Sequence, residues 1–577
     1  MNGRERVNAI LHKRPADRLS WTTEVDHLTL DALPEGWRGI SSFDFCRRIG
    51  CDIFHLMNGR SFRSPAQQWG GKVNCVSYCE NGREVILWET PKKTLFSVYD
   101  GVHPIKYPVA TLQDVRIYRE MWEGATYIEQ DDRPALQALD REIGEDGIAT
   151  WFWGPSCIPL LLENVMGIEN FYYLLNDHPD DMTALIELMH QRELEAFTIL
   201  ARHPCEVITL CENTSTHYIS PDIYRRYNGP HQRDFVEIMH RNGKVAMLHM
   251  CGHVKDILAE IKKTGMDGIH ALTPPPTGNT PWELALDAWG DDTIIIGVFD
   301  SNTFLVEPLE NIPAALDRLY TPRLRRANFI LALPGDGLQV PLARFEAVAR
   351  WMEKQHGTAT RRTARRNDGN EKLPCHAKPQ ADNATPEGGS MAKPTTCKLS
   401  DSWQMFGPLD REDKIDVTQL RQAPEFLTAA GRRWPRRAIA PHEWQLDLAS
   451  LLGGAEEGKT AWVFIPFTVE QTGNVAFGIG ADWWFEAFVD GEPLLDTLAT
   501  GNKYASPSCD DHRREMELVA GEHLLTVRVI SGSAGFCLRV AAGTTAEINV
   551  IASGLRQRRK EALPQEVRVF LDGLNTP

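Results

Sequence analysis

The first part of the chain alternates short apolar runs with amphipathic stretches of helical period. Eight apolar runs each stop at a polar or glycine-containing tip, and most are followed by a helical pattern: 18–24, 51–56, 148–155, 207–213, 244–252, 267–272, 293–300 and 328–337. Eight βα units are the number at which a parallel sheet closes with both faces buried, which explains why the runs are continuously apolar. The pattern predicts an α/β fold, a (β/α)₈ TIM barrel.

One stretch between the second and third runs departs from this repeat. Residues 72–89 alternate as a β-hairpin that turns at Asn81-Gly82, and 92–101 follow as a third strand, so we expect an insertion here. Helical period is clear over 222–241, where Ser220 before Pro221 is a favourable N-cap with proline at the first helical position.

A composition break separates two halves of the chain. Residues 357–396 have no apolar period over most of their length and are rich in polar residues, Pro and Gly, which predicts a disordered linker. After it come short strand patterns without intervening helices, typical of an all-β sandwich. The expected domains are a barrel over 1–356, the linker, a jelly-roll-like sandwich over 397–555 and a tail over 556–577.

Charge narrows the class of partner. With 62 Lys and Arg against 78 Asp and Glu the net charge is −16, so the field repels phosphate and anionic lipid. We therefore expect no nucleic acid and no membrane partner, but a small molecule or a protein. The amino end has no apolar signal segment, and twelve cysteines are too dilute for a disulfide scaffold, so a cytoplasmic location is expected.

Polar residues at the tips of the predicted strands are the candidates for chemistry, because the carboxyl ends of barrel strands form the active sites of this fold. They are Glu24, His55, Glu212, His249, Cys251, His270, Asp300 and Asp336. Side chains two apart on a strand share a face, so His249 and Cys251 can reach one point. Imidazole and thiolate together suit Zn²⁺.

Three segments resemble the uroporphyrinogen decarboxylase superfamily: 4–21, 220–258 and 328–341. The His249-Met250-Cys251-Gly252 element resembles the zinc-dependent corrinoid methyltransferases of that superfamily, whose His and Cys bind zinc together with a second Cys from a Pro-Gly-Cys-Gly turn. Here that turn contains Asp336 in place of the Cys. The resemblance implies Zn²⁺ held by His249, Cys251 and Asp336, with Glu212 or His270 at the remaining position.

Porphyrinogen decarboxylation itself is disfavoured. True decarboxylases of the superfamily carry an arginine-containing stretch after the first strand that holds a substrate with eight carboxylates, whereas this chain has Glu24 and Asp26 there. An acidic replacement repels such a substrate.

The preferred hypothesis is a metal-dependent methyltransferase or demethylase component. It moves a methyl group between a small substrate and a corrinoid, which a separate protein supplies because the chain has no D-x-H-x-x-G cobalamin signature. One alternative is a metal-free decarboxylase with Glu212, His270 and Asp300 as acid and base groups. Another is a non-catalytic ligand- or glycan-binding protein, since the second half resembles jelly-roll modules of carbohydrate-active enzymes through 403–408, 480–491 and 521–529.

Overall fold

The computed structural model describes residues 1–57, 62–80, 83–355 and, with short gaps, 394–574. The gaps are 414, 419, 430, 443–444, 455–457, 499–500, 502–506 and 533–534. Nearly all of the predicted linker, and the predicted hairpin turn Asn81-Gly82, lie outside the described residues. The chain divides into two compact units, one of 1–73 with 107–370 and one of 74–106 with 371–577. In the described part, no helix is long and apolar enough to cross a membrane.

The first unit contains the predicted barrel. Its eight strands pair in parallel, in the order β1-β14-β13-β12-β11-β10-β9-β2. They are β1 (Ser20–Thr23), β2 (Ile53–Met57), β9 (Gly147–Trp153), β10 (Val207–Cys211), β11 (Val245–His249), β12 (Gly268–Leu272), β13 (Ile294–Val298) and β14 (Phe329–Leu333). Each strand falls inside one of the eight apolar runs, except that β2 and β9 each extend one residue beyond theirs. The prediction of a (β/α)₈ barrel is confirmed.

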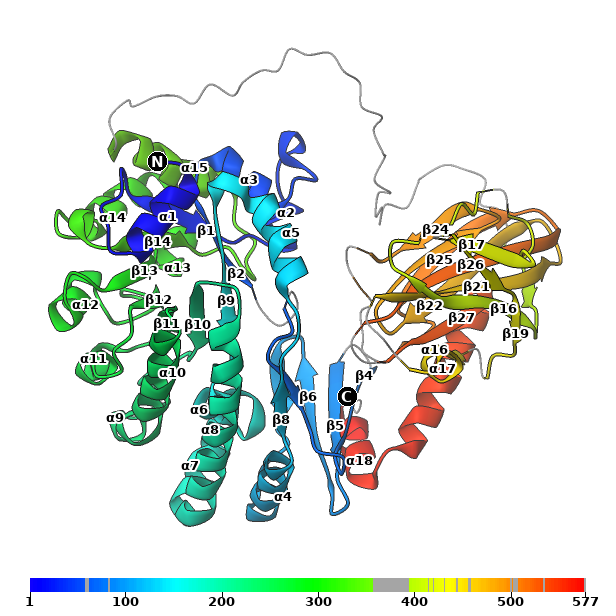
Figure 1. The fold of residues 1–577 in the computed structure, drawn as a ribbon, viewed down its shortest axis with the longest axis horizontal. Coiled ribbons are helices and arrows are strands. Elements are labelled where there is room, and N and C mark those ends of the chain that lie inside the picture. Colours follow the sequence, from blue (N-terminus) through cyan, green and yellow to red (C-terminus); the bar gives the residue numbers. More distant parts are fainter. Residues whose placement is uncertain are drawn as a thin grey trace, which may run out of the picture. The chain divides into compact units, whose positions relative to one another are not determined.

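Helices flank the strands on the outside of this sheet (Figure 1). The principal ones are α1 (Gly3–Leu11), α3 (Ser42–Ile49), α4 (Leu112–Glu123), α5 (Arg133–Ile143), α6 (Cys157–Leu160), α7 (Gly167–Asp177), α8 (Pro179–Arg202), α10 (Gly229–Arg241), α11 (Leu258–Lys262), α12 (Trp282–Trp289), α13 (Ser301–Leu305), α14 (Ile312–Leu319) and α15 (Leu342–Gln355). Ser220 caps its helix as predicted, with its Oγ accepting from Ile223 N at 3.2 Å. That helix then passes through a π-helical turn, Tyr224–Asn228, before α10.

One apolar cluster identifies the inward face of six barrel strands, which are β2, β9, β10, β11, β13 and β14. It joins Val207 of β10, Met247 of β11, Ile294 and Ile296 of β13, and Ile330 and Ala332 of β14 with residues of α1. The α1 side chains in it are Val7, Ile10 and Leu11, so α1 packs against the interior of the barrel. Because successive side chains on a strand alternate in direction, this cluster also fixes which residues near the strand ends face inward.

Side chains complete the seam between β1 and β2. Phe54 N donates to Thr22 Oγ1 at 3.2 Å, and Leu56 N donates to Glu24 Oε1 at 2.8 Å. Asp52 N donates to the backbone carbonyl of Trp21 at 2.8 Å. The side chains of Thr22 and Glu24 thus accept the hydrogen bonds that backbone carbonyl groups accept in a regular β-sheet.

We expect Thr22→Val to destabilise the protein by about 1 to 3 kcal/mol, because it leaves the buried Phe54 N–H without an acceptor. Thr22→Ser keeps the hydroxyl and is the matched control. Urea unfolding of both variants checks this. Equal stability of the two variants would show that the Thr22 hydroxyl does not hold the seam.

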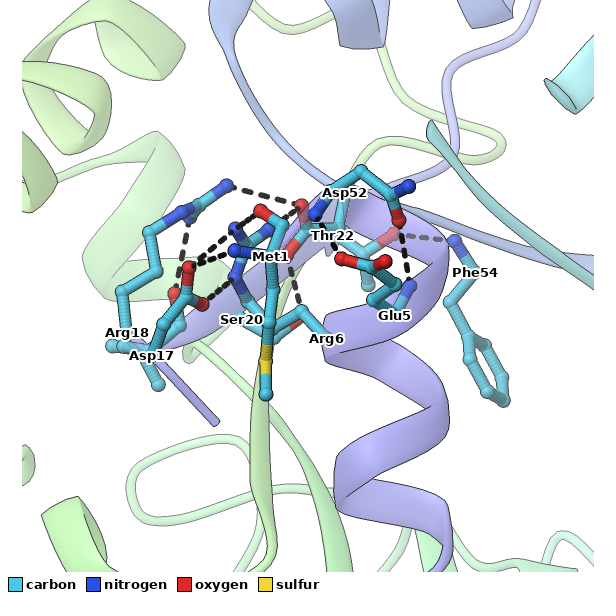
Figure 2. A network of polar contacts seen from close by, with 11 residues as sticks. Met1, Glu5, Arg6, Asp17, Arg18, Ser20, Thr22, Asp52 and Phe54 are labelled. Carbon is cyan, nitrogen blue, oxygen red and sulfur yellow. Dashed lines mark hydrogen bonds and ion pairs between the residues drawn. The ribbon is translucent and has the colours of Figure 1, made fainter. Parts of the chain in front are cut away.

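A buried ionic network lies at the amino ends of β1 and β2 (Figure 2). Asp52 accepts from Ser20 Oγ at 2.8 Å and Arg18 Nη2 at 3.0 Å, and it also pairs with Arg6 of α1. The side chains of Arg6 and Asp52 are 5% and 3% exposed, and Arg6 also pairs with Asp17, whose Oδ1 lies 2.7 Å from Arg6 Nε. In this fold, polar groups at the amino ends of strands serve stability.

The second unit includes the predicted insertion. Strands β4 (Asn74–Glu80), β5 (Arg83–Glu89), β6 (Thr94–Asp100) and β7 (His103–Lys106) form one antiparallel sheet. Helix α18 (Gln565–Leu574) covers its apolar face, where Val567 and Leu571 pack with Val85 and Val98, and the rings of Phe96 and Phe570 lie 5.8 Å apart. Residues distant in sequence therefore share one small core.

The rest of the second unit is mostly antiparallel β-structure, as predicted. One sheet runs β19-β16-β21-β26-β23-β24, with β15 also on β21, and the other runs β20-β27-β22-β25. Their bounds are β15 (Cys397–Leu399), β16 (Trp403–Asp410), β19 (Arg437–Ile439), β20 (Gln445–Asp447), β21 (Lys459–Val469), β22 (Gly473–Ala481), β23 (Trp484–Val489), β24 (Glu492–Asp496), β25 (His512–Leu518), β26 (Gly521–Ile530) and β27 (Cys537–Gly543). Both sheets contribute to one buried cluster that includes Trp403, Val463, Phe477 and Val540. Helix α17 (Thr545–Ala562) packs Ile548 against Ala476 and Ala541.

Candidate active site

Two histidines meet at neighbouring strand ends of the barrel. His249 ends β11 and His270 lies opposite it on β12, and their Nδ1 atoms are 2.7 Å apart. This is a hydrogen-bond distance, so one Nδ1 carries the proton and the other accepts it. Both residues belong to the predicted site, and their direct pairing is a finding of the structure.

The pair points into the barrel. Phe152 of β9 meets His249 edge-on at 5.1 Å, and Phe54 of β2 stacks on His270 at 6.1 Å between ring centroids. Side chains from strands on different sides of the sheet can meet in this way only inside the cylinder. The inward position of Met247, two residues before His249, gives the same direction.

The backbone next to His270 is unusual. The β12–β13 register shifts between His270 and Leu272, and Ala271 has a φ of 65°. A residue with a Cβ rarely takes this left-handed conformation, and such strain collects at functional sites. β-Bulges next to active sites re-aim side chains, and here the bulge lies beside the His270 ring.

The pair is held uncharged. Burial lowers the pKa of His249 to about 4, and burial together with the charge of His249 lowers the pKa of His270 well below its usual range. At neutral pH both rings are therefore neutral imidazoles, and one proton lies in the hydrogen bond between their Nδ1 atoms. The ring that donates through Nδ1 keeps a lone pair on Nε2, whereas the ring that accepts carries an Nε2–H.

The predicted zinc ligands lie at separate places. Cys251 is exposed and follows Met250, whose N–H donates to the carbonyl of His270 at 3.0 Å. Within the described ranges, the one group of three or more His, Cys, Asp or Glu side chains with ligand atoms within 4.8 Å of one another does not include His249, Cys251, Asp336 or Glu212. Of the predicted ligands, His249 and Cys251 lie two residues apart in the chain, and His270 lies beside His249.

Asp336 lines a different cleft, of about 170 Å³, together with Glu24 and His55. His55 Nδ1 is 3.0 Å from Glu24 Oε1. Strands β14, β1 and β2 are neighbours where the barrel closes, so their tips gather here. Two carboxylates make this cleft unfavourable for an anionic substrate.

Glu212 faces the helical layer. Val207 points inward, so residues an odd number of positions further on point outward. Glu212 is 1% exposed, and its Oε2 accepts from Gln232 Nε2 at 2.6 Å while its Oε1 has no hydrogen-bond partner among the described residues. Burial raises the pKa of Glu212 to about 7, against the hydrogen bonds with Ser156 and Gln232 that lower it.

Glu212→Gln is expected to change the pH dependence of stability. Because the folded pKa is raised, the native state favours the protonated carboxyl, and stability is lost as pH rises from about 4.5 to about 7. The variant lacks this loss, so its free energy of unfolding relative to the native chain should rise by up to about 3 kcal/mol across that window. Urea unfolding between pH 4 and 8 measures the difference. Parallel curves for the two proteins would contradict the assignment.

Both carboxylate oxygens of Asp300 accept hydrogen bonds from backbone N–H groups. It caps α13, where its Oδ1 accepts from Thr303 N at 2.7 Å, and its Oδ2 accepts from Thr277 N at 2.9 Å. Burial raises its pKa, but the hydrogen bonds from Thr277 and Thr303 outweigh this and hold the pKa below the usual range. This geometry orders two loops at the barrel mouth.

A second constellation was absent from the sequence prediction. Cys157 of α6, Glu193 of α8 and His231 of α10 bring a thiol, a carboxylate and an imidazole together, with ligand atoms within 4.8 Å of one another. The apolar surroundings of Cys157 in the sequence favoured a plain core cysteine. No local spacing could have revealed the group, because each member lies on a different helix.

Comparison with known proteins finds one family model that matches part of the barrel. Residues 159–357 match the family model described as uroporphyrinogen decarboxylase (URO-D). A solved methyltransferase from Methanosarcina mazei is 14% identical over 62% of this chain and all of its own, with a TM-score of 0.37. A β-glucosidase from Kluyveromyces marxianus is 10% identical over 65% of this chain and 58% of its own, with a TM-score of 0.19. No curated protein matches the chain.

Residues 159–357, the second part of the barrel, are thus similar to the uroporphyrinogen decarboxylase family, in agreement with the resemblance seen in the sequence. The superfamily is one of enzymes, which include decarboxylases and methyltransferases.

Proposed function

We propose that the barrel moves a methyl group between a small substrate and a corrinoid carried by a separate protein, with His249 and His270 at the reacting end. The observation that carries this proposal is the 2.7 Å contact between their Nδ1 atoms inside the barrel, beside the strained residue Ala271. A buried, uncharged imidazole pair at strand ends has no evident structural purpose. It is well suited to moving one proton.

The pair supplies both halves of an acid–base function. With a methoxylated substrate, the C–O bond breaks and its electron pair stays on the oxygen. The oxygen takes a proton from an imidazole N–H of the pair, the methyl group passes to the reduced corrinoid of the partner protein, and solvent returns the proton to the pair. Phe54 and Phe152 lie against the rings and limit the access of water.

A zinc ion at the mouth would be held by His249 and Cys251, with its other positions open to substrate and water. It would supply Lewis acidity to the substrate oxygen or sulfur. His270 would then orient His249 through Nδ1, as the partners of metal-bound histidines commonly do. Because Glu212 and Asp336 lie elsewhere, such an ion would be more weakly held than one with three protein ligands.

The cleft lined by Glu24 and Asp336 favours a neutral or cationic methyl donor over a carboxylated one. The metal-free decarboxylase hypothesis is less well supported. Of its three acid and base groups, Asp300 accepts two backbone hydrogen bonds and Glu212 faces the helical layer, so only His270 lies inside the barrel.

The test uses the full chain with free cob(I)alamin in place of the corrinoid protein. A panel of methoxylated aromatics, methylamines and methyl thioethers is incubated with it, with and without chelator. Formation of methylcobalamin, with the demethylated product in equal amount, is the expected result. Release of CO₂ from a carboxylated substrate, with no methylcobalamin from any donor, would replace the proposal with the decarboxylase.

A further inference from the structure

Cys157, Glu193 and His231 form a compact donor group in the helical layer of the barrel. Their side chains come from α6, α8 and α10, and one ligand atom of each lies within 4.8 Å of the others. Cys157 is fully buried and Glu193 is 3% exposed. Sulfur, nitrogen and oxygen donors in one place are the set that Zn²⁺ binds.

The surroundings of this group are rich in acceptors. Negative charges of Glu193 and Glu212 both act on Cys157, and Glu193 acts on Glu212. Burial raises the pKa of Glu193, against the hydrogen bond and the charge of His190, which lower it. A divalent ion would add positive charge beside these buried carboxyl groups.

Two buried acceptors near the group support the same conclusion. Glu212 Oε1 and Asn228 Oδ1 have no hydrogen-bond partner in the described part of the chain. Asn228 Nδ2 lies 3.5 Å from Glu212 Oε2, so the two side chains are neighbours. Unpaired buried acceptors of this kind call for an ion or an ordered water.

Neighbouring side chains hold the donors from outside. His190 stacks on His231 with ring centroids 3.7 Å apart, its Nε2 lies 2.8 Å from Asp234, and its Nδ1 lies 3.5 Å from Glu193. Support of ligands by a second layer of polar groups is typical of metal sites. A π-helical turn follows α6 and another precedes α10, and such turns frequently mark functional positions.

We propose that Cys157, Glu193 and His231 bind one divalent metal ion, with Zn²⁺ the best match, at a site separate from the barrel mouth. Thiolate and carboxylate together balance the charge of a divalent ion, and three protein ligands leave one tetrahedral position for water. Bonds of about 2.0 to 2.3 Å place ligand atoms roughly 3.3 to 3.8 Å apart, so the donors close in by about 1 Å on binding. The ion would join α6, α8 and α10.

Metal analysis of the full chain, purified without chelator and loaded with zinc, tests this. The chain with His249→Ala and Cys251→Ala together should keep about one equivalent of zinc, whereas adding Cys157→Ser or His231→Gln to that double variant should remove it. Cys205→Ser, at a buried cysteine outside the group, is the matched control and should keep the metal. Zinc X-ray absorption of the double variant should show one sulfur with nitrogen or oxygen neighbours.

The outcomes separate the two proposed sites. Zinc kept when Cys157→Ser or His231→Gln is added to the double variant, or an absorption spectrum of the double variant without one sulfur, overturns the inference. If those added variants do not fold, as judged by circular dichroism, the metal content and spectrum of the double variant decide alone. Absence of methyl transfer in every form, with zinc lost only from the Cys157 and His231 variants, defeats the proposed function and leaves this site standing.

Discussion

Replacing His249 with alanine should lower the rate of methylcobalamin formation by about 10² to 10⁴, the usual contribution of a positioned acid–base group. His270→Ala should lower it as well, because His249 then loses the Nδ1 partner that lies 2.7 Å away. His240→Ala is the matched control, since His240 is exposed and pairs with Asp267 before the start of β12. Initial rates of the three variants at saturating substrate give the comparison.

The pH profile of the same reaction gives a second readout. The pKa of His249 is lowered to about 4, so the neutral pair persists above that pH and activity is lost only as pH falls through about 4. A variant with His249→Ala that keeps its rate to within about threefold, or a native profile that falls between pH 6 and 7, would remove the pair from the mechanism.

Asp52→Ala should be the most destabilising of the single changes proposed, with a loss of about 3 to 5 kcal/mol in the free energy of unfolding. It removes the buried counter-charge of Arg6, 5% exposed, and leaves it only the more exposed Asp17 in the network of Figure 2. Asp181→Ala breaks the pair with Arg116, which is largely exposed, and should cost far less. Urea unfolding of both variants measures the contrast, and losses of similar size would show that burial of the pair carries no special weight.

The barrel could be predicted because its strands are buried on both faces. A continuous apolar run such as 207–213 gives the strand but hides which side chains point inward, since neither face is polar. The sequence therefore predicted Glu212 at the barrel mouth. Val207 faces inward, and Glu212, five residues further on, faces the helical layer instead. A one-residue offset sends a side chain to the other face of the sheet.

The candidate site was predicted in part for a related reason. His249 and His270 are adjacent because β11 and β12 are neighbours in the sheet, which follows from chain order. Asp336 follows β14, three strands from β11, and instead gathers with Glu24 and His55 where the barrel closes. The order of the strands around the barrel decides which strand ends lie close together, and residue types alone do not reveal this.

The group of Cys157, Glu193 and His231 could not be predicted. Its members lie on three helices whose rotations are set by packing, and no short motif joins them. Only coordinates bring them together.

The packing of α18 on the sheet β4–β7 has a consequence for synthesis of the chain. The ribosome makes that sheet early, before the last six barrel strands (β9 to β14) have left the exit tunnel, and it makes the covering helix last. During the whole interval Val85, Leu87, Phe96 and Val98 have no permanent cover, so the nascent protein is most in need of a chaperone there. A chain ended at the linker would carry this uncovered sheet for its lifetime and should aggregate.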